Sequence, residues 1–475
     1  MSEHDEICRK TIVEVAPLIE SGSLSPVTLT EAMLTRIEAI DDRLNSYITV
    51  TRDLALAQAH RAEQEIAAGD YRGALHGIPL GIKDLVNIAG VKTTCASTIM
   101  ADYTPDFSAT VMENLNEAGA ITLGKLNLTE FALYGYHPEY TAPSNPWNLA
   151  HWAGVSSSGS GAATGASLCF GAIGSDTGGS IRFPSAACGI VGIKPTFAKV
   201  SRHGVFPLAD TLDHVGPMTR SVADAAIMLA AMEGRDERDP STRCDPPGQY
   251  LDAIRTGVKG LRVGIDRDYC AGDTDPAMTA ACFRALDKFA DLGAEIIEFN
   301  RPEMVKAADH WMDTCAVDAL NGHHDFYPAQ RDQYGPVFRA LLDHGAQVSA
   351  QAYAAGEKQR QATRALFDAL FCEVDVIATP AMPTPAPPQS ETPPQQVALP
   401  EDIAPLVRYA APSDYSGNPS ITFPNGFTDG GVPTAMQLIG NTADETTIIR
   451  AAYAYEQASE WFRMRPDEAH LHGSK

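Results

Sequence analysis

Residues 154–192 read GVSSSGSGAATGASLCFGAIGSDTGGSIRFPSAACGIVG, a stretch rich in Gly, Ser and Ala whose only charged residues are Asp176 and Arg182. Small side chains permit tight turns and let one backbone segment approach another closely. They also make a poor solvated surface. We therefore expect this stretch to be buried and to contain sharp turns.

The segments around this stretch alternate between strand-like and helix-like patterns. Residues 75–91 are mostly apolar with a short period, which is typical of a buried strand. Ser108 is expected to cap a helix that ends at Gly119, and residues 121–123 to form the next strand. Residues 261–299 repeat the strand–helix–strand pattern. Alternation of this kind predicts an α/β protein.

Helices are expected on either side of this core. Apolar residues recur at helical spacing over 26–45, behind the start signal Ser25-Pro26, and an Ala-rich helical stretch covers about 52–68. Together they predict an N-terminal helical hairpin laid on the main body. Ser221 with Asp224 resembles a capping box and predicts the start of a further helix.

The charge balance excludes two classes of partner. The chain has 475 residues, with 36 Lys and Arg against 60 Asp and Glu, a formal net charge of −24. Such a surface repels phosphate backbones and anionic lipid, and no basic run offsets it, so we expect no nucleic acid and no membrane as partners. The N-terminus lacks an apolar leader, and no run of 18 apolar residues occurs. We expect a cytoplasmic protein.

Cysteine and histidine give no sign of a metal centre. The nine cysteines are scattered and odd in number, and none forms a CxxC pair, so reduced thiols are expected. His137 and His323-His324 have no HExxH motif or second ligand cluster beside them. We interpret them as core or surface histidines and expect no metal site.

Two segments carry polar groups in unusual surroundings. Residues 77–84, GIPLGIKD, place Lys83 in an apolar strand-like run, which is costly unless the amine is paired or neutral. On its own, this lysine could simply reach water at a strand end. Residues 154–161 contain three consecutive serines, and alone they would fit a flexible turn or a weak anion cradle without the P-loop pattern.

A third segment, GSDTGGSIR at 174–182, follows an expected strand. Glycines before Ser180 allow backbone N–H groups to converge beside its hydroxyl, as an oxyanion hole requires. A Gly-Gly-Ser turn alone is more often structural than catalytic. The chain lacks a G-x-S-x-G elbow, which disfavours a Ser-His-Asp hydrolase, whereas a desolvated Lys83 could serve as the base.

Taken in order, these segments resemble the amidase signature family of amide-bond hydrolases. The resemblance extends over most of the chain: SLSPVTLTEAMLTRIEAI, HGIPLGIKD, ATVMENLNEAGAITLGKLNLTEFA, NPWN, the Ser/Gly block, GSDTGGSIRFPSAACGIVGIKPT, LDHVGPMTRSVADAA and GNPSITFPNGF…MQLIG. The most specific part is the embedded lysine combined with SSxG…GSDTGGSIR.

Carried over residue by residue, the resemblance makes Ser180 the nucleophile, Lys83 the base and Ser156 the bridging serine, which the family holds with a cis peptide bond. The 24-residue separation of Ser156 from Ser180 equals the family's spacing and selects it over its two serine neighbours. The resemblance further implies an oxyanion hole made of the backbone N–H groups of Thr177, Gly178, Gly179 and Ser180. It also implies three supporting residues, Ser157, Asp176 and Arg182.

The chain departs from the family pattern at two positions. Val155 and Ser158 stand where the family commonly has glycine. Val155 would be strained at positive φ, so we expect extended backbone there. Four aromatic residues lie in the nearby segment: Phe131, Tyr134, Tyr136 and Tyr140. They could line an apolar substrate pocket or simply pack in the core, and the sequence leaves both possibilities open.

The resemblance implies a serine amidase that hydrolyses the C–N bond of a small or aryl amide, or of a carbamate or urea, through an acyl-enzyme on Ser180. No metal or organic cofactor is expected. One alternative is the glutaminase subunit of a tRNA-dependent amidotransferase, although residues 413–419, SDYSGNP, look unlike the glutamine-site stretch of that subunit. Another is a non-catalytic binding protein on the same scaffold, which retention of all three catalytic residue types argues against.

The fold implied is α/β, with a large mixed twisted β-sheet covered by helices on both sides in one amidase domain over residues 1–475. Its parts would be the N-terminal hairpin (1–70), a catalytic core (71–225), a helical and loop region that shapes the substrate pocket (230–405) and a return to the core (405–475). The expected partner is a small-molecule amide. A homodimer is common in relatives and stays open here.

Overall fold

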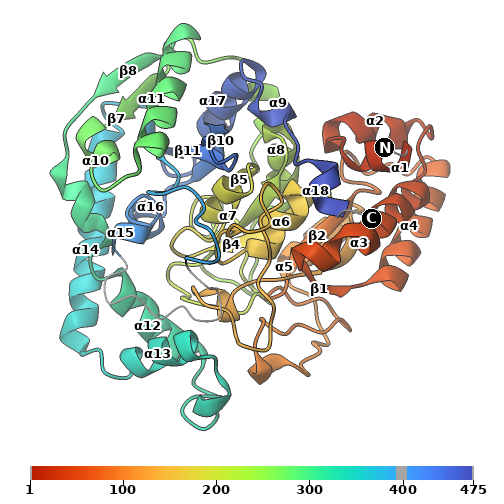
Figure 1. Ribbon diagram of the computed structural model, residues 1–475, viewed down its shortest axis with the longest axis horizontal. Coiled ribbons are helices and arrows are strands. Elements are labelled where there is room, and N and C mark those ends of the chain that lie inside the picture. The colour runs from red at the N-terminus through yellow and green to blue at the C-terminus, as the bar shows by residue number, and fades with distance from the viewer. Residues whose placement is uncertain (1–2, 392–403, 473–475) are drawn as a thin grey trace.

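The computed structural model describes residues 3–391 and 404–472, and the strands it contains form one eleven-stranded sheet (Figure 1). The strands are β1 (Tyr47–Val50), β2 (Pro79–Lys83), β3 (Ile121–Leu126), β4 (Gly171–Asp176), β5 (Val191–Lys194), β6 (His214–Thr219), β7 (Arg262–Ile265), β8 (Glu295–Glu298), β9 (Val376–Pro380), β10 (Ser420–Phe427) and β11 (Pro433–Gly440). Their spatial order is β1-β3-β2-β4-β6-β5-β10-β11-β9-β7-β8.

The sheet is mixed, as the sequence predicts. Strand β2 runs parallel to β3 and β4, and β7 runs parallel to β8 and β9. The remaining pairs are antiparallel. Every residue of β2, β3, β4, β5 and β6 is buried, which explains why these strands read as continuous short-period segments and not as alternating ones.

Helices cover the sheet in two groups. The helices are α1 (Glu3–Cys8), α2 (Ile12–Glu20), α3 (Pro26–Leu44), α4 (Arg52–Ala67), α5 (Thr110–Glu117), α6 (Ser158–Gly165), α7 (Arg182–Ala187), α8 (Val222–Met232), α9 (Tyr250–Ala253), α10 (Arg267–Ala271), α11 (Pro276–Asp291), α12 (Trp311–Gly322), α13 (Pro336–Gly345), α14 (Ala350–Leu370), α15 (Ala404–Val407), α16 (Ala411–Ser416), α17 (Glu445–Gln457) and α18 (Glu468–His472). Helices α6 and α7 pack together against the central strands, and so do α8 and α17, which identifies the two covered faces.

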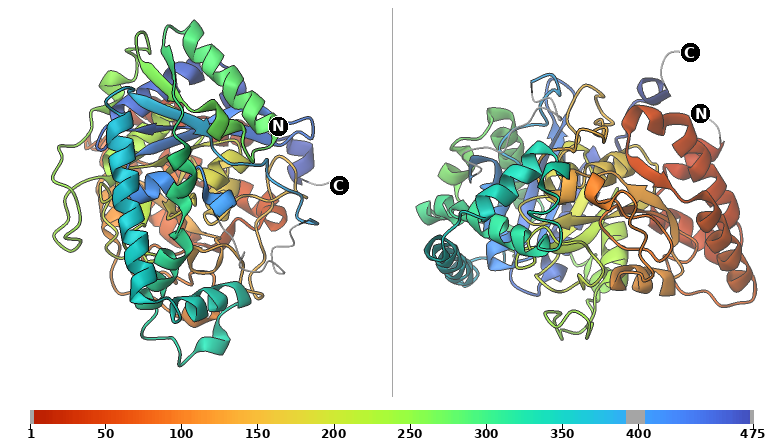
Figure 2. Two further views of the ribbon diagram at one scale, coloured as in Figure 1. Left: turned by 90° about the vertical axis from the view of Figure 1, so that its left-hand side faces the viewer. Right: turned by 90° about the horizontal axis from the view of Figure 1, so that it is seen from below.

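The helical start signals in the sequence operate as predicted at two places. Ser25 accepts hydrogen bonds from the N–H groups of Val27 and Thr28 and begins α3, which packs against α4 as the expected hairpin. Ser221 accepts from the N–H of Asp224 and begins α8. Figure 2 shows the N-terminal helices at the opposite end of the molecule from α14.

Two expected element boundaries are wrong. Ser108 does not cap α5, because its Oγ accepts a hydrogen bond from the N–H of Ala89 at 3.0 Å and the helix begins after Ala109. The strand expected over 75–91 covers only β2, because the chain turns directly after Lys83. Of the expected region 230–405, residues 392–403 lie outside the described part of the chain.

The topology brings the serine-rich segments to one edge of the sheet. The parallel strands β2 and β4 end at Lys83 and Asp176, so their carboxyl ends lie side by side. Helix α6 begins at Ser158, and the turn from β4 into α7 carries residues 177–181. The motifs singled out in the sequence therefore meet in one place.

Candidate active site

Lys83 is the centre of a buried hydrogen-bond cluster. It ends β2 and has no exposed surface. Its Nζ lies 2.8 Å from the Oγ atoms of Ser156, Ser157 and Ser175. Burial lowers the pKa of Lys83 to about 7, although the carboxylates of Asp176 and Asp213 oppose this shift. The lysine is thus held by three hydroxyl groups where an ammonium ion is poorly solvated.

The protonation of Lys83 follows from this arrangement. A lysine with a pKa near 7 is present to a large extent as the neutral amine at neutral pH. A neutral amine has two N–H donors and one lone pair, so one of its three hydroxyl neighbours must donate to it. Ser157 donates instead to the carbonyl oxygen of Ser175 at 3.2 Å. In the neutral form the lone pair therefore faces Ser156 or Ser175, and Lys83 can accept a proton from either hydroxyl.

The three consecutive serines have three different surroundings. The peptide bond between Val155 and Ser156 is cis, and Val155 does not adopt a positive φ. Ser157 is held by its neighbours Lys83 and Ser175. Ser158 turns away from the lysine, and its Oγ accepts a hydrogen bond from the Tyr136 hydroxyl at 2.7 Å. Of the three, Ser156 and Ser157 contact Lys83.

Ser180 lies on the tight turn between β4 and α7 and is 8% exposed. Its carbonyl oxygen accepts from the N–H of Ser157 at 3.2 Å, which ties this turn to the serine block. Its hydroxyl has no hydrogen-bond partner within residues 3–391 and 404–472, and in particular none with Ser156. The hydroxyl faces open space instead, in the pocket described below.

The turn also presents backbone N–H groups, but one of the four expected donors is already engaged. The N–H of Gly179 donates to Asp176 Oδ1 at 2.7 Å, so we remove it from the expected oxyanion hole. The N–H groups of Thr177, Gly178 and Ser180 donate no hydrogen bond to any residue of the described chain. These three remain available to an oxygen atom bound beside Ser180.

Hydrogen bonds made by Asp176 and Arg182 hold this turn in place. Besides Gly179, Asp176 accepts hydrogen bonds from the N–H groups of Ile181 and Arg182, at 3.0 and 3.3 Å. The Arg182 guanidinium donates to both carboxylate oxygens of Asp176, at 3.0 and 2.8 Å. Burial alone would raise the pKa of Asp176, but the charge and hydrogen bonds of Arg182 outweigh it and hold that pKa well below its usual range. A permanently ionised Asp176 keeps the turn in one shape.

Sequence reasoning missed Asp414, which completes this cluster. Its Oδ2 lies 2.7 Å from Arg182 Nη2, and both side chains are fully buried. Burial raises the pKa of Asp414 to about 8, against the opposing effect of Arg182. The available signal was weak, because the segment RYAAPSDYSG is largely polar and does not by itself mark Asp414 as buried. Ser175, also missed, lies within the GSDTGG motif itself.

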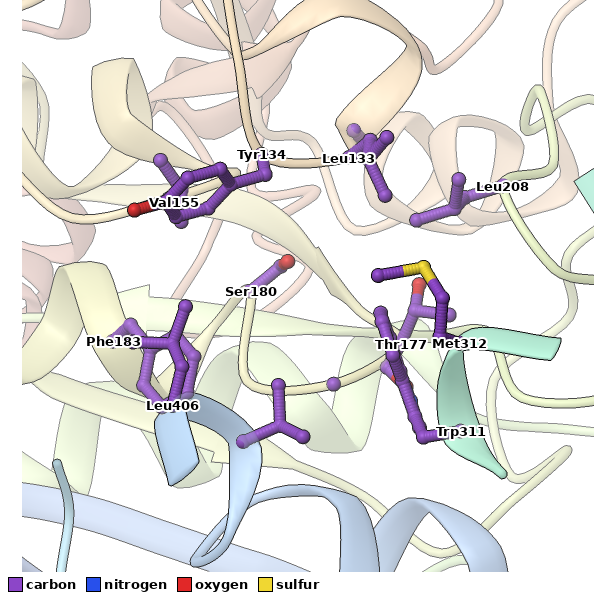
Figure 3. A pocket seen from close by; sticks show the side chains of 13 residues that line it. Leu133, Tyr134, Val155, Thr177, Ser180, Phe183, Leu208, Trp311, Met312 and Leu406 are labelled. Carbon is purple, nitrogen blue, oxygen red and sulfur yellow. The ribbon is translucent and has the colours of Figure 1, made fainter. Parts of the chain in front are cut away.

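A pocket opens in front of Ser180 (Figure 3). Its cavity volume is about 30 Å³, enough for water and well below the range usual for small-molecule sites. Among the described residues, no charged side chain lines it. The lining residues are Ala132, Leu133, Tyr134, Val155, Thr177, Gly178, Ser180, Phe183, Leu208, Trp311, Met312, Leu406 and Val407. Figure 3 shows the Ser180 hydroxyl among them, with Tyr134 and Val155 on one side and Phe183 and Leu406 on another.

Aromatic side chains enclose the glycine turn. A Cβ atom added to Gly178 would lie 2.5 Å from Cζ2 of Trp311, and one added to Gly179 would lie 2.4 Å from Cζ of Phe183. The indole Nε1–H of Trp311 donates to the carbonyl oxygen of Thr177 at 3.0 Å. Glycine is therefore required at both positions, because the rings occupy the space of a side chain. Nothing in the sequence around Trp311 indicated this contact.

Only one of the four aromatic residues considered from the sequence lines this pocket. Tyr134 does so, whereas Phe131 packs against the rings of Phe206 and His323 in the core. The Tyr136 hydroxyl donates a hydrogen bond to Ser158, and Tyr140 is not among the residues that line the pocket. His323 is buried, and its Nδ1 lies 2.9 Å from the Tyr334 hydroxyl, a core histidine as interpreted.

The described residues offer neither a metal cluster nor a membrane span. No group of three or more His, Cys, Asp or Glu side chains in residues 3–391 and 404–472 is placed to hold a metal ion. None of the helices in the same ranges is both long and apolar enough to cross a membrane.

Similarity to known proteins extends over the whole site. The family model described as Amidase matches residues 28–449. A Mycobacterium tuberculosis protein named "Putative amidase AmiD" is 42% identical over 98% of this chain and 97% of its own length. A Glutamyl-tRNA(Gln) amidotransferase subunit from Geobacter metallireducens is 37% identical over 97% of this chain and 99% of its own. The structure of native peptide amidase from Stenotrophomonas maltophilia has a TM-score of 0.81 at 30% identity, covering 96% of this chain and 97% of that one.

Proposed function

This chain belongs to the amidase signature family and is a hydrolase of carbon–nitrogen bonds, and from that premise we propose that Ser180, Ser156 and Lys83 form its catalytic triad. The single observation that supports this most strongly is the fully buried Lys83, with a pKa near 7 and a 2.8 Å contact to Ser156. A general base works best when its pKa lies near the operating pH.

In the proposed acylation, neutral Lys83 accepts the proton of Ser156 as Ser156 accepts that of Ser180. The Ser180 oxygen then attacks the amide carbon, and the N–H groups of Thr177, Gly178 and Ser180 stabilise the resulting oxyanion. The proton returns through Ser156 to the leaving amine, and the C–N bond breaks. Since Ser156 and Ser180 share no hydrogen bond in the free enzyme, their hydroxyls must approach when substrate binds.

In the proposed deacylation, water attacks the acyl-enzyme on Ser180. Its proton passes through Ser156 to Lys83 and then back to the Ser180 oxygen, which releases the carboxylic acid. Ser157 and Ser175 are proposed to position Lys83. Asp176 and Arg182 are proposed to position the turn that carries Ser180, and Asp414 accepts a further hydrogen bond from the Arg182 guanidinium.

The proposed substrate is a small neutral amide with an apolar or aryl acyl group, with carbamates and ureas as chemically related carbonyls. The pocket residues that the structure describes carry no charge, which supports this choice. Glutamine carries an α-carboxylate and an α-ammonium group, which would be left without charged partners there. That argues against the second candidate, a glutaminase component of an amidotransferase, although the 37% identical relative keeps it open to test. We further propose one amidase domain, a cytoplasmic location and a homodimer.

The test is product release by mass spectrometry from glutamine, an aliphatic amide, an aryl anilide and an aryl carbamate, with no partner protein added. Wild type is compared with Ser180→Ala. We expect turnover of an anilide or carbamate that disappears in Ser180→Ala. Ammonia from glutamine alone would favour the amidotransferase role, and unchanged turnover in Ser180→Ala would overturn the proposed nucleophile.

A further inference from the structure

A second cavity lies between α11, β10, the end of α17 and the short 3₁₀ helix Trp461–Arg463. Its volume is about 520 Å³, within the usual range of small-molecule sites. It shares no lining residue with the pocket of Ser180. In Figure 1, α11 and α17 lie beside β10 and β11, away from the N-terminal helices.

The cavity is basic in a strongly acidic protein. Arg284 and Lys288 of α11 line it together with Arg463, and Glu460 is the only acidic residue among the described lining residues. Within the described residues, none of the three cations has a carboxylate oxygen within 4.0 Å. Since the chain as a whole carries a formal charge of −24, three unpaired cations around one cavity are an unusual concentration of positive charge. Such a group attracts an anion.

Two buried polar groups in the same cavity also lack partners. Asn425 is 3% exposed, and neither its Nδ2 nor its Oδ1 has a hydrogen-bond partner in the described part of the chain. The Oγ of Ser459 is in the same condition. Asn425 lies at a β-bulge, where the pairing of β10 with β11 shifts between Pro424 and Gly426. Bulges re-aim side chains, and buried polar groups are nearly always hydrogen-bonded. Both polar atoms of Asn425 are closed to water in this structure, so a ligand supplies their missing partners once the carboxamide turns toward the cavity.

We propose that this cavity binds a small organic anion that carries a cis-amide edge next to its charge. The three cations would hold the anionic oxygens. The carboxamide of Asn425 offers one donor and one acceptor side by side, which matches the C=O and N–H of a cis amide in two hydrogen bonds. This site is separate from the proposed amidase chemistry, and its failure would leave that chemistry untouched.

The test uses three ring compounds and isothermal titration calorimetry on the full chain. L-Pyroglutamate has both a carboxylate and a lactam, cyclopentanecarboxylate lacks the lactam, and 2-pyrrolidone lacks the carboxylate. We expect pyroglutamate to bind wild type at least about tenfold more tightly than either other compound. Asn425→Leu should remove the advantage of pyroglutamate over cyclopentanecarboxylate.

Variants of two of these cations, the exposed Arg284 and the half-buried Lys288, test the charge requirement. Arg284→Gln with Lys288→Gln should weaken pyroglutamate binding about tenfold or more and leave hydrolysis of an aryl amide unchanged. Lys358→Gln, a matched change at an exposed lysine of α14, should leave binding as in wild type.

Three results would overturn the proposal: no binding of pyroglutamate to wild type at millimolar concentration, equal binding of pyroglutamate and cyclopentanecarboxylate, or undiminished binding by the Arg284/Lys288 variant. If Asn425→Leu fails to fold, the proposal is still tested by the comparison of ligands on wild type and by the Arg284/Lys288 variant.

Discussion

The turn that carries Ser180 and the pocket wall that faces it are built in opposite ways. The turn is held by polar contacts within a few residues, since Asp176 accepts the N–H groups of Gly179, Ile181 and Arg182. The wall is apolar and comes from distant segments, among them the start of α12 and the helix α15. Figure 3 shows the two meeting around the Ser180 hydroxyl.

This difference assigns separate tasks to the two regions. Hydrogen bonds fix the turn in one geometry, so a change there should affect the rate of the chemical step. Apolar contacts shape the wall, so a change there should affect which acyl groups fit. The two regions are in contact at Gly178 and Trp311. Substitutions at these two positions therefore test whether the turn and the wall have separate roles.

The largest expected effect belongs to the polar region, in Lys83→Met. This change keeps the side-chain volume but removes the proposed base, so kcat/KM should fall by about 10³-fold or more. The change also removes three hydrogen bonds to buried serine hydroxyls, so the thermal unfolding midpoint should fall while the protein remains folded at the assay temperature. Initial rates and a thermal melt check both. Near-wild-type turnover would show that Lys83 is not the base.

The next effect compares two neighbouring serines. Ser156→Ala should lower kcat/KM by about 10²-fold or more, because it removes the proposed relay between Ser180 and Lys83. Ser158→Ala removes only the hydrogen bond from Tyr136, worth about 1 kcal/mol of stability, and should leave activity nearly intact. Steady-state kinetics on both variants provide the measurement. A reversed order would mean that the wrong serine was chosen.

A double substitution tests the contact between turn and wall. Gly178→Ala places a Cβ 2.5 Å from Trp311, which should displace the turn and lower kcat/KM by about 10²-fold. Trp311→Phe removes the part of the ring that clashes, so the double variant should recover activity relative to Gly178→Ala alone. Strictly additive losses would contradict the steric account.

The smallest expected effect is a shift in pH dependence. The base must be deprotonated, so kcat/KM should rise with pH through about 7, the pKa of Lys83, and then level off. The Asp213 carboxylate raises this pKa, so Asp213→Asn should move the rise to lower pH. A pH profile of each protein supplies the measurement. A rise at higher pH in Asp213→Asn would contradict the proposed electrostatic influence.

The two regions also differ in how far sequence alone could predict them. Lys83 stands out locally as a charge in an apolar strand, whereas Ser156, Asp176 and Arg182 were predicted from the resemblance to the family, Ser156 by its spacing from Ser180. The alternation of strand and helix patterns predicted an α/β protein, the resemblance implied a mixed sheet covered by helices, and both are confirmed. The expected donor Gly179 failed because a motif gives no information on which N–H groups are already bonded.

The wall could not be predicted, and the reason is physical. Trp311 and Leu406 are ordinary apolar residues in segments without a motif, and only tertiary packing brings them to Ser180. The prediction that Ser108 caps a helix was wrong for a related reason. Its hydroxyl accepts a hydrogen bond from a neighbouring loop and not from the helix that follows it.

The central claim is that Ser180 forms an acyl-enzyme. Its most direct test is rapid quenching of wild type with an aryl amide or carbamate that it turns over, followed by intact-protein and peptide mass spectrometry. We predict an added mass equal to the acyl group on Ser180 at steady state, absent in Ser180→Ala. The same adduct on another residue, or turnover retained in Ser180→Ala, would contradict the account.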